Sequence, residues 1–195
     1  MKHPGWKLNL GLLTLVTLTT FSIASYAAAP YGWFIAGSKP ESYECGLDHS
    51  ALHNDDPSAY LKANDSAVEG FGTLMQNFRA DHYAGKRIRF SAFVKSAETQ
   101  NWAGLWMRVD KAAKTVAFDN MHDRPIKGTS DWHKYDVVLD VPEDATGIYI
   151  GVLLNGSGEV WLSDANIEVV GPDVSTTGEH IRLSADEPIN LDFRQ

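Results

Sequence analysis

The chain has 195 residues, of which 44% are apolar and 22% are charged, and its formal net charge is −8 at pH 7. A chain of this length and composition can bury one good hydrophobic core, so we expect one main domain. The acidic balance, without a cluster of lysines and arginines, argues against nucleic acid or an anionic membrane surface as a partner.

The first 27 residues have the pattern of a secretory signal peptide. Lys2 and Lys7 give a positively charged start, positions 8–23 form an uncharged apolar run, and small residues precede a cut after Ala27. The apolar run is shorter than the roughly 20 residues that a membrane span needs, so we expect no stable membrane anchor. This segment therefore predicts a protein that is secreted or periplasmic, in a bacterium.

The only cysteine of the chain is Cys45, so no intramolecular disulfide can form even in an oxidising compartment. Stability must then come from the core alone. Cys45 lies in an alternating apolar stretch, which favours a small buried side chain over a nucleophile.

From residue 28 to residue 171, apolar residues alternate with polar ones, and Gly, Asn, Asp and Pro separate the runs. The predicted strands are 33–36, 43–47, 59–62, 72–78, 87–94, 103–109, 116–119, 135–141, 148–154 and 159–170. Only 57–64 could form a short helix. Many short strands are typical of an all-β fold, a jelly-roll β-sandwich in a single domain at 28–171. The polar tail, 172–195, could add a last strand at 189–193.

Several sequence blocks resemble a known bacterial domain. The blocks are Glu69–Gln76, Tyr83–Ser91, Trp102–Asp110 and, most specific, FDNMHDRPIKGTSDW at Phe118–Trp132. They are similar to an accessory β-sandwich domain of the galactose-binding-like, carbohydrate-binding-module-like type, and the resemblance covers nearly all of 32–170. Such domains are attached to secreted hydrolases, including serine peptidases and erythromycin-esterase-like proteins, and follow helix-turn-helix regions in some transcription regulators.

The resemblance implies a fold and a ligand-binding role, but a shared fold does not transfer a particular ligand. Relatives usually carry a second acid beside the position of Asp164, where this chain has Ser163. That departure argues against a bound cation at this spot. Without the hydrolase or DNA-binding region that accompanies the domain elsewhere, the chain must act alone or through a protein partner.

No familiar catalytic motif is present: there is no G-x-S-x-G, no H-E-x-x-H, no Gly-rich phosphate loop and no cysteine pair for zinc. We therefore predict a protein that is not an enzyme and needs no cofactor. His49 and His53 are four residues apart with acids nearby, and on a helix they could share a face and bind a metal. A polar loop between two strands is the preferred interpretation, so no metal site is predicted.

The best candidate ligand site lies in the stretch 103–109. Leu105, Met107 and Val109 alternate and are expected to face the core, which turns Trp106 and Arg108 together to the opposite side. A Trp ring beside a guanidinium is a common way to hold a sugar, because the ring covers C–H faces and the guanidinium fixes hydroxyls or carboxylates.

Four further residues are predicted to join this ligand site. Asn120, His122 and Arg124 follow in the segment expected to lie beside the strand, and Trp102 precedes it. Together with Trp106 and Arg108 they could line one pocket.

A purely structural role is the alternative for the same residues. Trp106 could pack under a loop, Arg124 and Pro125 could form a rigid turn that caps loop carbonyls, and Trp132 and Trp161 could belong to the core. Loop-fixing acceptors, not catalytic acids, are the expected roles of Asp119, Asp123 and Asp164.

The function that we expect from the sequence is a non-catalytic binding module for a glycan or another small polar ligand. Two alternatives remain open. One is a periplasmic protein-interaction or structural subunit, which an exposed apolar patch would favour. The other is an enzyme with an unrecognised acid/base pair, which two carboxylates at a glycosidase-like separation would favour.

Overall fold

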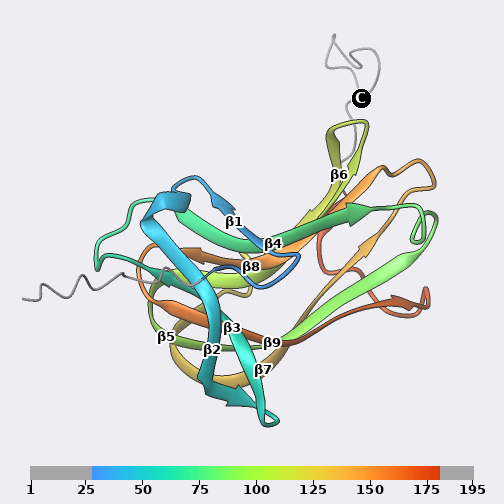
Figure 1. Cartoon of the computed structure of the whole chain (residues 1–195). Coiled ribbons are helices and arrows are strands. Elements are labelled where there is room, and N and C mark those ends of the chain that lie inside the picture. The colour runs from blue at the N-terminus through green and yellow to red at the C-terminus, as the bar shows by residue number, and fades with distance from the viewer. Residues whose placement is uncertain (1–27, 181–195) are drawn as a thin grey trace, which may run out of the picture.

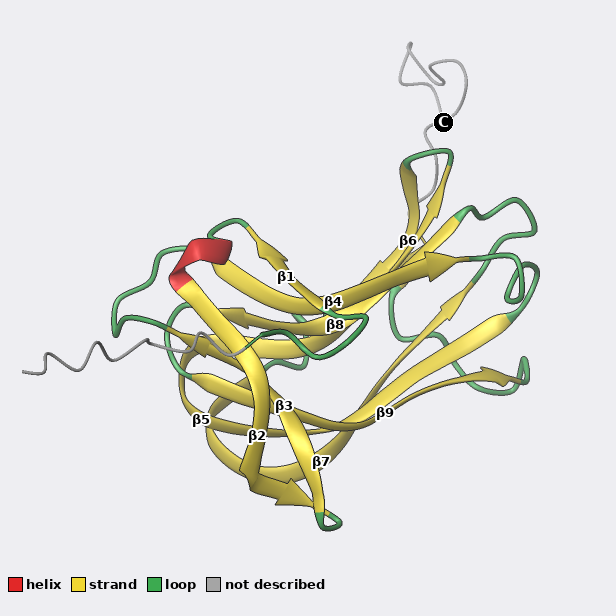
Figure 2. Cartoon of the chain, viewed as in Figure 1, coloured by secondary structure: helices red, strands yellow, loops and turns green. Residues whose placement is uncertain are grey.

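A computed structural model describes residues 28–180, so the predicted signal peptide and the predicted strand at 189–193 lie outside the described residues. The described part is built almost wholly of strands and contains no α-helix (Figure 2). Within this range no helix is long and apolar enough to cross a membrane. The elements are β1 (Phe34–Gly37), a 3-10 turn (Pro40–Ser42), β2 (Tyr43–His53), β3 (Asp56–Ala63), β4 (Phe71–Arg79), β5 (Arg87–Lys111), β6 (Lys114–Asp119), β7 (Ile126–Asp140), β8 (Gly147–Asn155), β9 (Glu159–Val170) and β10 (Glu179–His180).

The strands confirm the all-β prediction, with two corrections. The segment 57–64 is not a helix: it lies in β3, where Ser58 and Leu61 are buried and the backbone pairs with β2 and β9. The predicted strands 87–94 and 103–109 are one continuous strand, β5. Its pairing with β7 does not stop at residue 94 but continues to Ala103 across three register shifts. Such irregularities bend a strand and keep its ladder going.

One sheet curls on itself in the order β1-β4-β8-β5-β9-β3-β2. The long strand β5 belongs to both sides of the curl, because its first half pairs with β7 and β9 and its second half pairs with β8 and β6. Two facing layers result (Figure 1). We call β1, β4, β8, β6 and the second half of β5 the first layer, and β2, β3, β9, β7 and the first half of β5 the second layer.

The core fills the space between the two layers. Leu74 and Leu105 reach it from the first layer, and Leu61, Ile88 and Phe90 reach it from the second; all five side chains are fully buried. Burying each side chain of this size contributes about 1.5–3 kcal/mol relative to leaving it exposed. The inward residues of each strand thus pack in the core and cannot contact a ligand. Ligand contacts must therefore come from the outer faces, the loops or the edges of the layers.

Candidate functional site

Strand β5 orients the predicted ligand residues as its alternation requires. Leu105, Met107 and Val109 are fully buried in the main core, so Trp106 and Arg108 lie on the outer face of the first layer. The predicted direction of these two side chains is therefore confirmed.

Trp106 is not an open stacking surface, however, because only 7% of the residue is exposed. It packs with Met75 and Leu153 in a second apolar cluster on the outer face. Its Nε1 donates a hydrogen bond to Thr73 Oγ1 at 2.7 Å, and that hydroxyl donates to the backbone oxygen of Val152 at 2.8 Å. The ring thus packs against other residues of the domain, and its N–H already has a hydrogen-bond partner.

Glycine at position 151 makes room for the Trp106 ring. Gly151 lies opposite Trp106 in the β5–β8 register, and a Cβ atom there would lie 2.8 Å from Trp106 Nε1 and 2.5 Å from the backbone oxygen of Leu74. Only a residue without a side chain fits so close an approach.

Arg108 keeps more of its side chain accessible, with 36% exposed. Its Cζ lies 4.1 Å from the centre of the Tyr149 ring, a cation–π geometry, and Nη2 lies 3.1 Å from Asp110 Oδ2. The Nε atom of Arg108 is buried and has no hydrogen-bond partner among the described residues. The guanidinium is therefore fixed in place, with part of its hydrogen-bonding capacity unused.

A pocket of about 320 Å³ lies beside these two residues, and we call it the Arg108 pocket. Its lining residues are Ala36, Gly37, Phe71, Thr73, Met75, Trp106, Arg108, Phe118 and Leu153. The lining is mostly apolar and aromatic, and Arg108 is its only charged member. A few polar groups in an apolar concavity is the usual composition of a small-molecule site.

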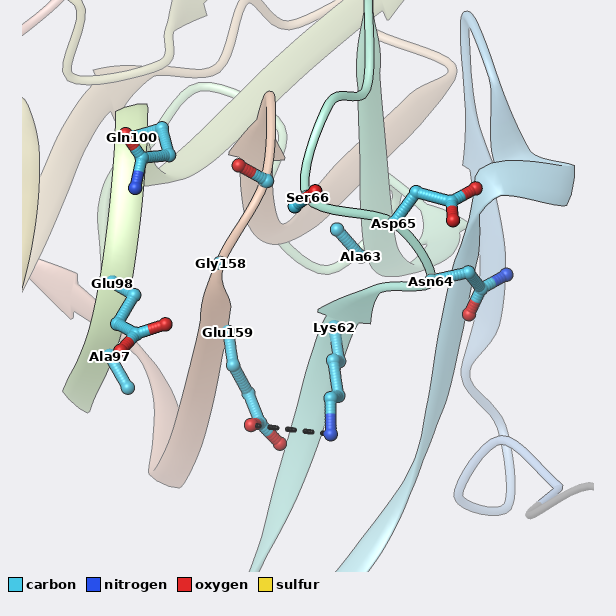
Figure 3. A pocket seen from close by; sticks show the side chains of 11 residues that line it. Lys62, Ala63, Asn64, Asp65, Ser66, Ala97, Glu98, Gln100, Gly158 and Glu159 are labelled. Carbon is cyan, nitrogen blue, oxygen red and sulfur yellow. Dashed lines mark ion pairs between the residues drawn. The ribbon is translucent and has the colours of Figure 1, made fainter.

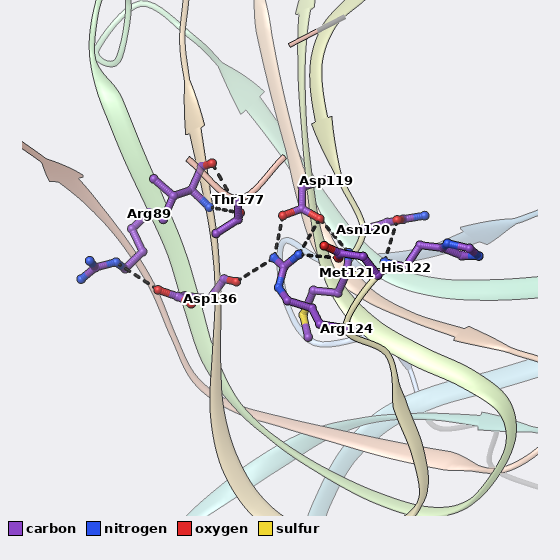
Figure 4. Close-up of polar contacts among 10 residues, drawn as sticks. Arg89, Asp119, Asn120, Met121, His122, Arg124, Asp136 and Thr177 are labelled. Atoms are coloured by element: carbon purple, nitrogen blue, oxygen red, sulfur yellow. Dashed lines mark hydrogen bonds and ion pairs between the residues drawn. The ribbon is translucent and has the colours of Figure 1, made fainter. Parts of the chain in front are cut away.

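The segment after β6 does not join this pocket as predicted, because its polar residues hold the loop together (Figure 4). Arg124 Nη2 lies 2.6 Å from Asp119 Oδ2 and donates to the backbone oxygen of Asp136 at 3.2 Å. Burial opposes the charged form of Arg124 and is the largest single influence, but the hydrogen bonds and charges of Asp119 and Asp123 together outweigh it, so the pKa of Arg124 is raised. Arg124 therefore bonds a backbone carbonyl of strand β7, and not a carbonyl of the loop as had been considered.

The same loop uses its other side chains locally. Asp119 Oδ1 accepts from the backbone N–H of Met121 at 2.8 Å, and Asn120 Oδ1 accepts from that of His122 at 3.1 Å. Asp123 Oδ1 accepts a hydrogen bond from Arg124 Nη1 at 2.9 Å. Asp119 and Asp123 are thus the loop-fixing acceptors that were expected.

The six predicted ligand residues are therefore divided between regions. Asn120 and His122 line a separate pocket of about 290 Å³, together with Phe118, Asp119, Asp123, Thr177 and Gly178. Trp102 contacts the His122 ring edge-on, with the ring centroids 5.5 Å apart. The prediction of one common pocket is wrong, because these residues are divided between two separate pockets, which share Phe118.

Trp132 and Trp161, which were considered for the core, are half-buried and hold the β2–β3 hairpin. Trp161 Nε1 donates to Asp48 Oδ2 at 2.9 Å, and Trp132 Nε1 donates to the backbone oxygen of Leu52 at 3.1 Å. Asp164 Oδ2 lies 2.9 Å from His53 Nδ1, again as a loop-fixing acceptor. Each of these groups already has a structural partner.

The histidine pair lies within β2, not in the loop that was expected. Among residues 28–180 no group of three or more His, Cys, Asp or Glu side chains is placed to hold a metal ion. Cys45 is buried, and burial raises the pKa of its thiol, so a reactive thiolate is disfavoured.

A polar pocket of about 290 Å³ at the ends of β3 and β9 was missed by the sequence analysis (Figure 3). Lys62 Nζ and Glu159 Oε2 face each other across it at 3.9 Å. Burial raises the pKa of Glu159, and the nearby carboxylates of Asp48 and Glu44 add to this while Lys62 opposes it. No aromatic ring lines this pocket, so it offers no apolar platform for a sugar.

Comparison with known proteins gives one relative in sequence. No protein-family model matches the chain. The uncharacterized HTH-type transcriptional regulator YbfP of Bacillus subtilis (strain 168) is 46% identical over 167 residues, which is 84% of this chain. The chain spans only 57% of the length of that regulator. This relative agrees with the expectation that similar domains accompany helix-turn-helix regions.

Solved structures share the fold at low sequence identity. The CBM22-1 xylan-binding domain of Paenibacillus barcinonensis Xyn10C has a TM-score of 0.53 at 12% identity, covering 74% of this chain and 90% of that domain. The enzymatically active domain of bacteriophage CBA120 tailspike protein 4 has a TM-score of 0.55 at 14% identity, covering 72% of this chain and 20% of that one.

The Stig cyclase Fisc of Fischerella sp. TAU also matches, with a TM-score of 0.52 at 14% identity, covering 74% of this chain and 87% of the cyclase. These likenesses confirm the jelly-roll β-sandwich. Because a xylan-binding module and a cyclase both have this fold, the fold alone does not decide between binding and catalysis.

Proposed function

We propose that this chain is an exported, non-catalytic binding module for a glycan or another small polar ligand, and that the Arg108 pocket is its ligand site. The observation that carries the proposal is the pocket itself, an apolar and aromatic concavity with one fixed guanidinium. Strands build it, so its residues are held in place before a ligand arrives. Preorganisation of this kind reduces the cost of binding.

The chemistry of the pocket favours a neutral ligand that carries hydroxyl groups. Phe71, Met75 and Phe118 offer apolar surface for the C–H face of a sugar ring. Arg108 offers directional donors, and Asp110 beside it offsets its charge. An anionic ligand would gain little attraction from a guanidinium that is already paired, whereas a neutral hydroxyl can still accept from its free N–H groups.

Three observations support the non-catalytic binding role. No familiar catalytic motif is present in the sequence. A module whose name states that it binds xylan shares the fold. Asp119, Asp123 and Asp164, the acids singled out in the sequence, each have a structural partner: the first two pair with Arg124, and Asp164 contacts His53 and Asn54.

A glycan array followed by titration calorimetry tests the ligand site. We expect the protein to retain a neutral glycan, and Arg108→Ala to weaken this binding about tenfold or more. Arg79→Ala is the matched control, since the Arg79 side chain is 85% exposed and, within residues 28–180, pairs only with Asp81. Array binding that is absent, or equal for the two variants, would overturn the proposal.

Export is tested separately by cell fractionation and intact-mass measurement. The pattern of residues 1–27 predicts a mature chain that starts at Ala28. An exported protein that retains Met1 would overturn the cleavage, and recovery in the cytoplasm alone would overturn export.

The relationship to YbfP favours a second candidate function, a ligand-sensing domain that serves a regulator. It would use the same pocket, so calorimetry does not separate the two candidates. The location of the protein separates the two candidates, because a domain that controls the DNA binding of a regulator would be found in the cytoplasmic fraction.

A further inference from the structure

Asp110 lies beside the guanidinium of the Arg108 pocket, on the outer face of the first layer. It follows Arg108 by two positions in β5, so the two side chains share a face. Asp110 Oδ2 lies 3.1 Å from Arg108 Nη2, and the Asp110 side chain is only 10% exposed. Among residues 28–180, Arg108 is the one ion-pair partner of this carboxylate, and its Oδ1 atom is buried without a hydrogen-bond partner. A buried carboxylate with a single counterion therefore adjoins the ligand site.

The backbone holds Asp110 in this place. The N–H and the hydroxyl of Thr146 both donate to the backbone oxygen of Asp110, at 2.8 and 3.1 Å. Asp110 also pairs with Gly147 of β8 and with Thr115 of β6, so strands flank it on both sides. The sheet thus fixes the position from which the carboxylate reaches Arg108.

Tyr149 holds the same guanidinium through a second contact. Arg108 and Tyr149 lie opposite each other in the β5–β8 register, and Arg108 Cζ lies 4.1 Å from the centre of the ring. An Arg108 side chain that moved toward an anionic ligand would lose the ring and the carboxylate together. We therefore expect the guanidinium to stay paired with Asp110 when a ligand enters.

These two residues set the charge at this wall of the pocket. Arg108 is the only charged residue that lines the pocket, and Asp110 does not line it. Because the carboxylate lies so close to Nη2, it offsets most of the positive charge that a group in the pocket would meet. A ligand carboxylate would lose its water for little attraction, whereas a hydroxyl needs only the N–H donors. Asp110 thus disfavours anions without touching the ligand.

We propose that Asp110 determines the specificity of the Arg108 pocket: it restricts the site to neutral glycans and excludes glycans that carry uronic acids. The inference rests on the proposed function, because it concerns the same site. Asp110 acts through Arg108, so it is a positioning residue and not a ligand contact. Specificity often comes from an element that disfavours the wrong ligand, and a fixed carboxylate is such an element.

A glycan array that carries neutral and uronic-acid oligosaccharides side by side tests this inference. Asp110→Asn keeps the shape of the side chain and an acceptor for Nη2 but removes the charge. Retention of uronic-acid glycans relative to neutral ones should then rise about tenfold or more over the wild type, because the guanidinium is free to pair with a carboxylate. The added retention should fall as the salt concentration rises. A purely structural role of Asp110 would leave this ratio unchanged.

Asp144→Asn is the matched control. Asp144 is 58% exposed and pairs with Lys111, the residue after Asp110, so this variant also removes one negative charge but leaves Arg108 with its counterion. It should keep the wild-type ratio of uronic-acid to neutral glycans. Circular dichroism checks that each variant folds, and Asp110→Ser, which removes the same charge, replaces Asp110→Asn if that variant does not fold.

The outcomes separate this inference from the proposed function. An unchanged ratio in the Asp110 variant, or an equal rise in Asp144→Asn, would overturn the inference and leave the proposed function in place. A wild type that retains uronic-acid glycans as well as neutral ones would also overturn it. A wild type that retains no glycan would overturn the proposed function, and this inference with it.

Discussion

The loop after β6 and the Arg108 pocket contrast in how far their polar groups are already used. In the loop, Arg124 is bonded to Asp119 and to a backbone oxygen, and Asn120 holds a backbone N–H. In the pocket, the Nε atom of Arg108 has no hydrogen-bond partner among residues 28–180. A dense run of polar and aromatic residues therefore marks a loop whose polar groups are already paired, whereas free hydrogen-bonding capacity lies on one guanidinium in the middle of a strand.

Trp106, like Arg124, already has its partners within the fold. Its replacement should have the largest effect on the free energy of unfolding. Trp106→Ala should lower the free energy of unfolding by about 3–5 kcal/mol, because it leaves a cavity in the second apolar cluster. Denaturant unfolding of the purified domain measures this. Trp106→Phe, which keeps a ring and loses the bond to Thr73, should cost less, about 1 kcal/mol for the hydrogen bond.

An unchanged unfolding midpoint in Trp106→Ala would contradict this view. The ring would then be dispensable for the fold and available as a stacking surface.

Arg124 should have the next largest effect. In Arg124→Ala the carboxylate of Asp119, whose side chain is only 5% exposed, loses its counterion. Because Arg124 itself is partly exposed, we expect a loss of about 2 kcal/mol, less than for a fully buried pair. Thermal and denaturant unfolding measure the loss, and Asp123→Ala, at a 77% exposed side chain, should cost little. Equal costs for the two variants would show that the loop does not depend on the Arg124–Asp119 pair.

A smaller effect should appear as a pH dependence at the β2–β3 hairpin. Asp48 accepts hydrogen bonds from the Ser50 hydroxyl and N–H and from Trp161 Nε1, and these bonds lower the pKa of its carboxyl. A lowered folded-state pKa means that the stabilisation is present above the unfolded value of about 3.9 and is lost as the pH falls through the folded value.

The measurement is the free energy of unfolding from pH 6 downward in the wild type, Asp48→Asn and the exposed control Asp65→Asn. The difference between the wild type and Asp48→Asn should shrink as the pH falls below about 4. A difference that stays constant with pH would show that the charge of Asp48 does not contribute.

The smallest expected effect is that of a reducing agent. Cys45 is the only cysteine and is buried, so dithiothreitol should leave the melting temperature unchanged. A large drop would reveal a bridge between two chains.

The sequence predicted what depends on neighbours along one strand. Alternation placed Leu105 in the core and Arg108 on the outer face, and most strands were located. Alternation did not predict that Trp106 is buried, because the burial depends on Thr73 and Gly151 from two other strands. Pairing across the sheet is not visible in local periodicity.

The same reason explains the other misses. The segment 57–64 is a strand because β2 and β9 flank it, although its own residues could also suit a helix. The Arg108 pocket is lined by residues of β1, β4, β5, β6 and β8, which meet only in the folded sheet, so no local pattern records it. A structural role was considered for Arg124 and expected for Asp119, but the sequence analysis did not pair the two residues, which lie five positions apart.

The shared strand β5 also governs the order in which the chain can fold. Its two ends need partners that come much later in the sequence, since Arg87 pairs with Val170 and Asp110 pairs with Gly147. A chain that emerges from its N-terminus therefore has to wait for β8 and β9 before β5 is enclosed on both sides. Distant pairings of this kind slow folding. They also keep the growing chain without a finished core until nearly the whole domain has been delivered, a property compatible with transport in an unfolded form.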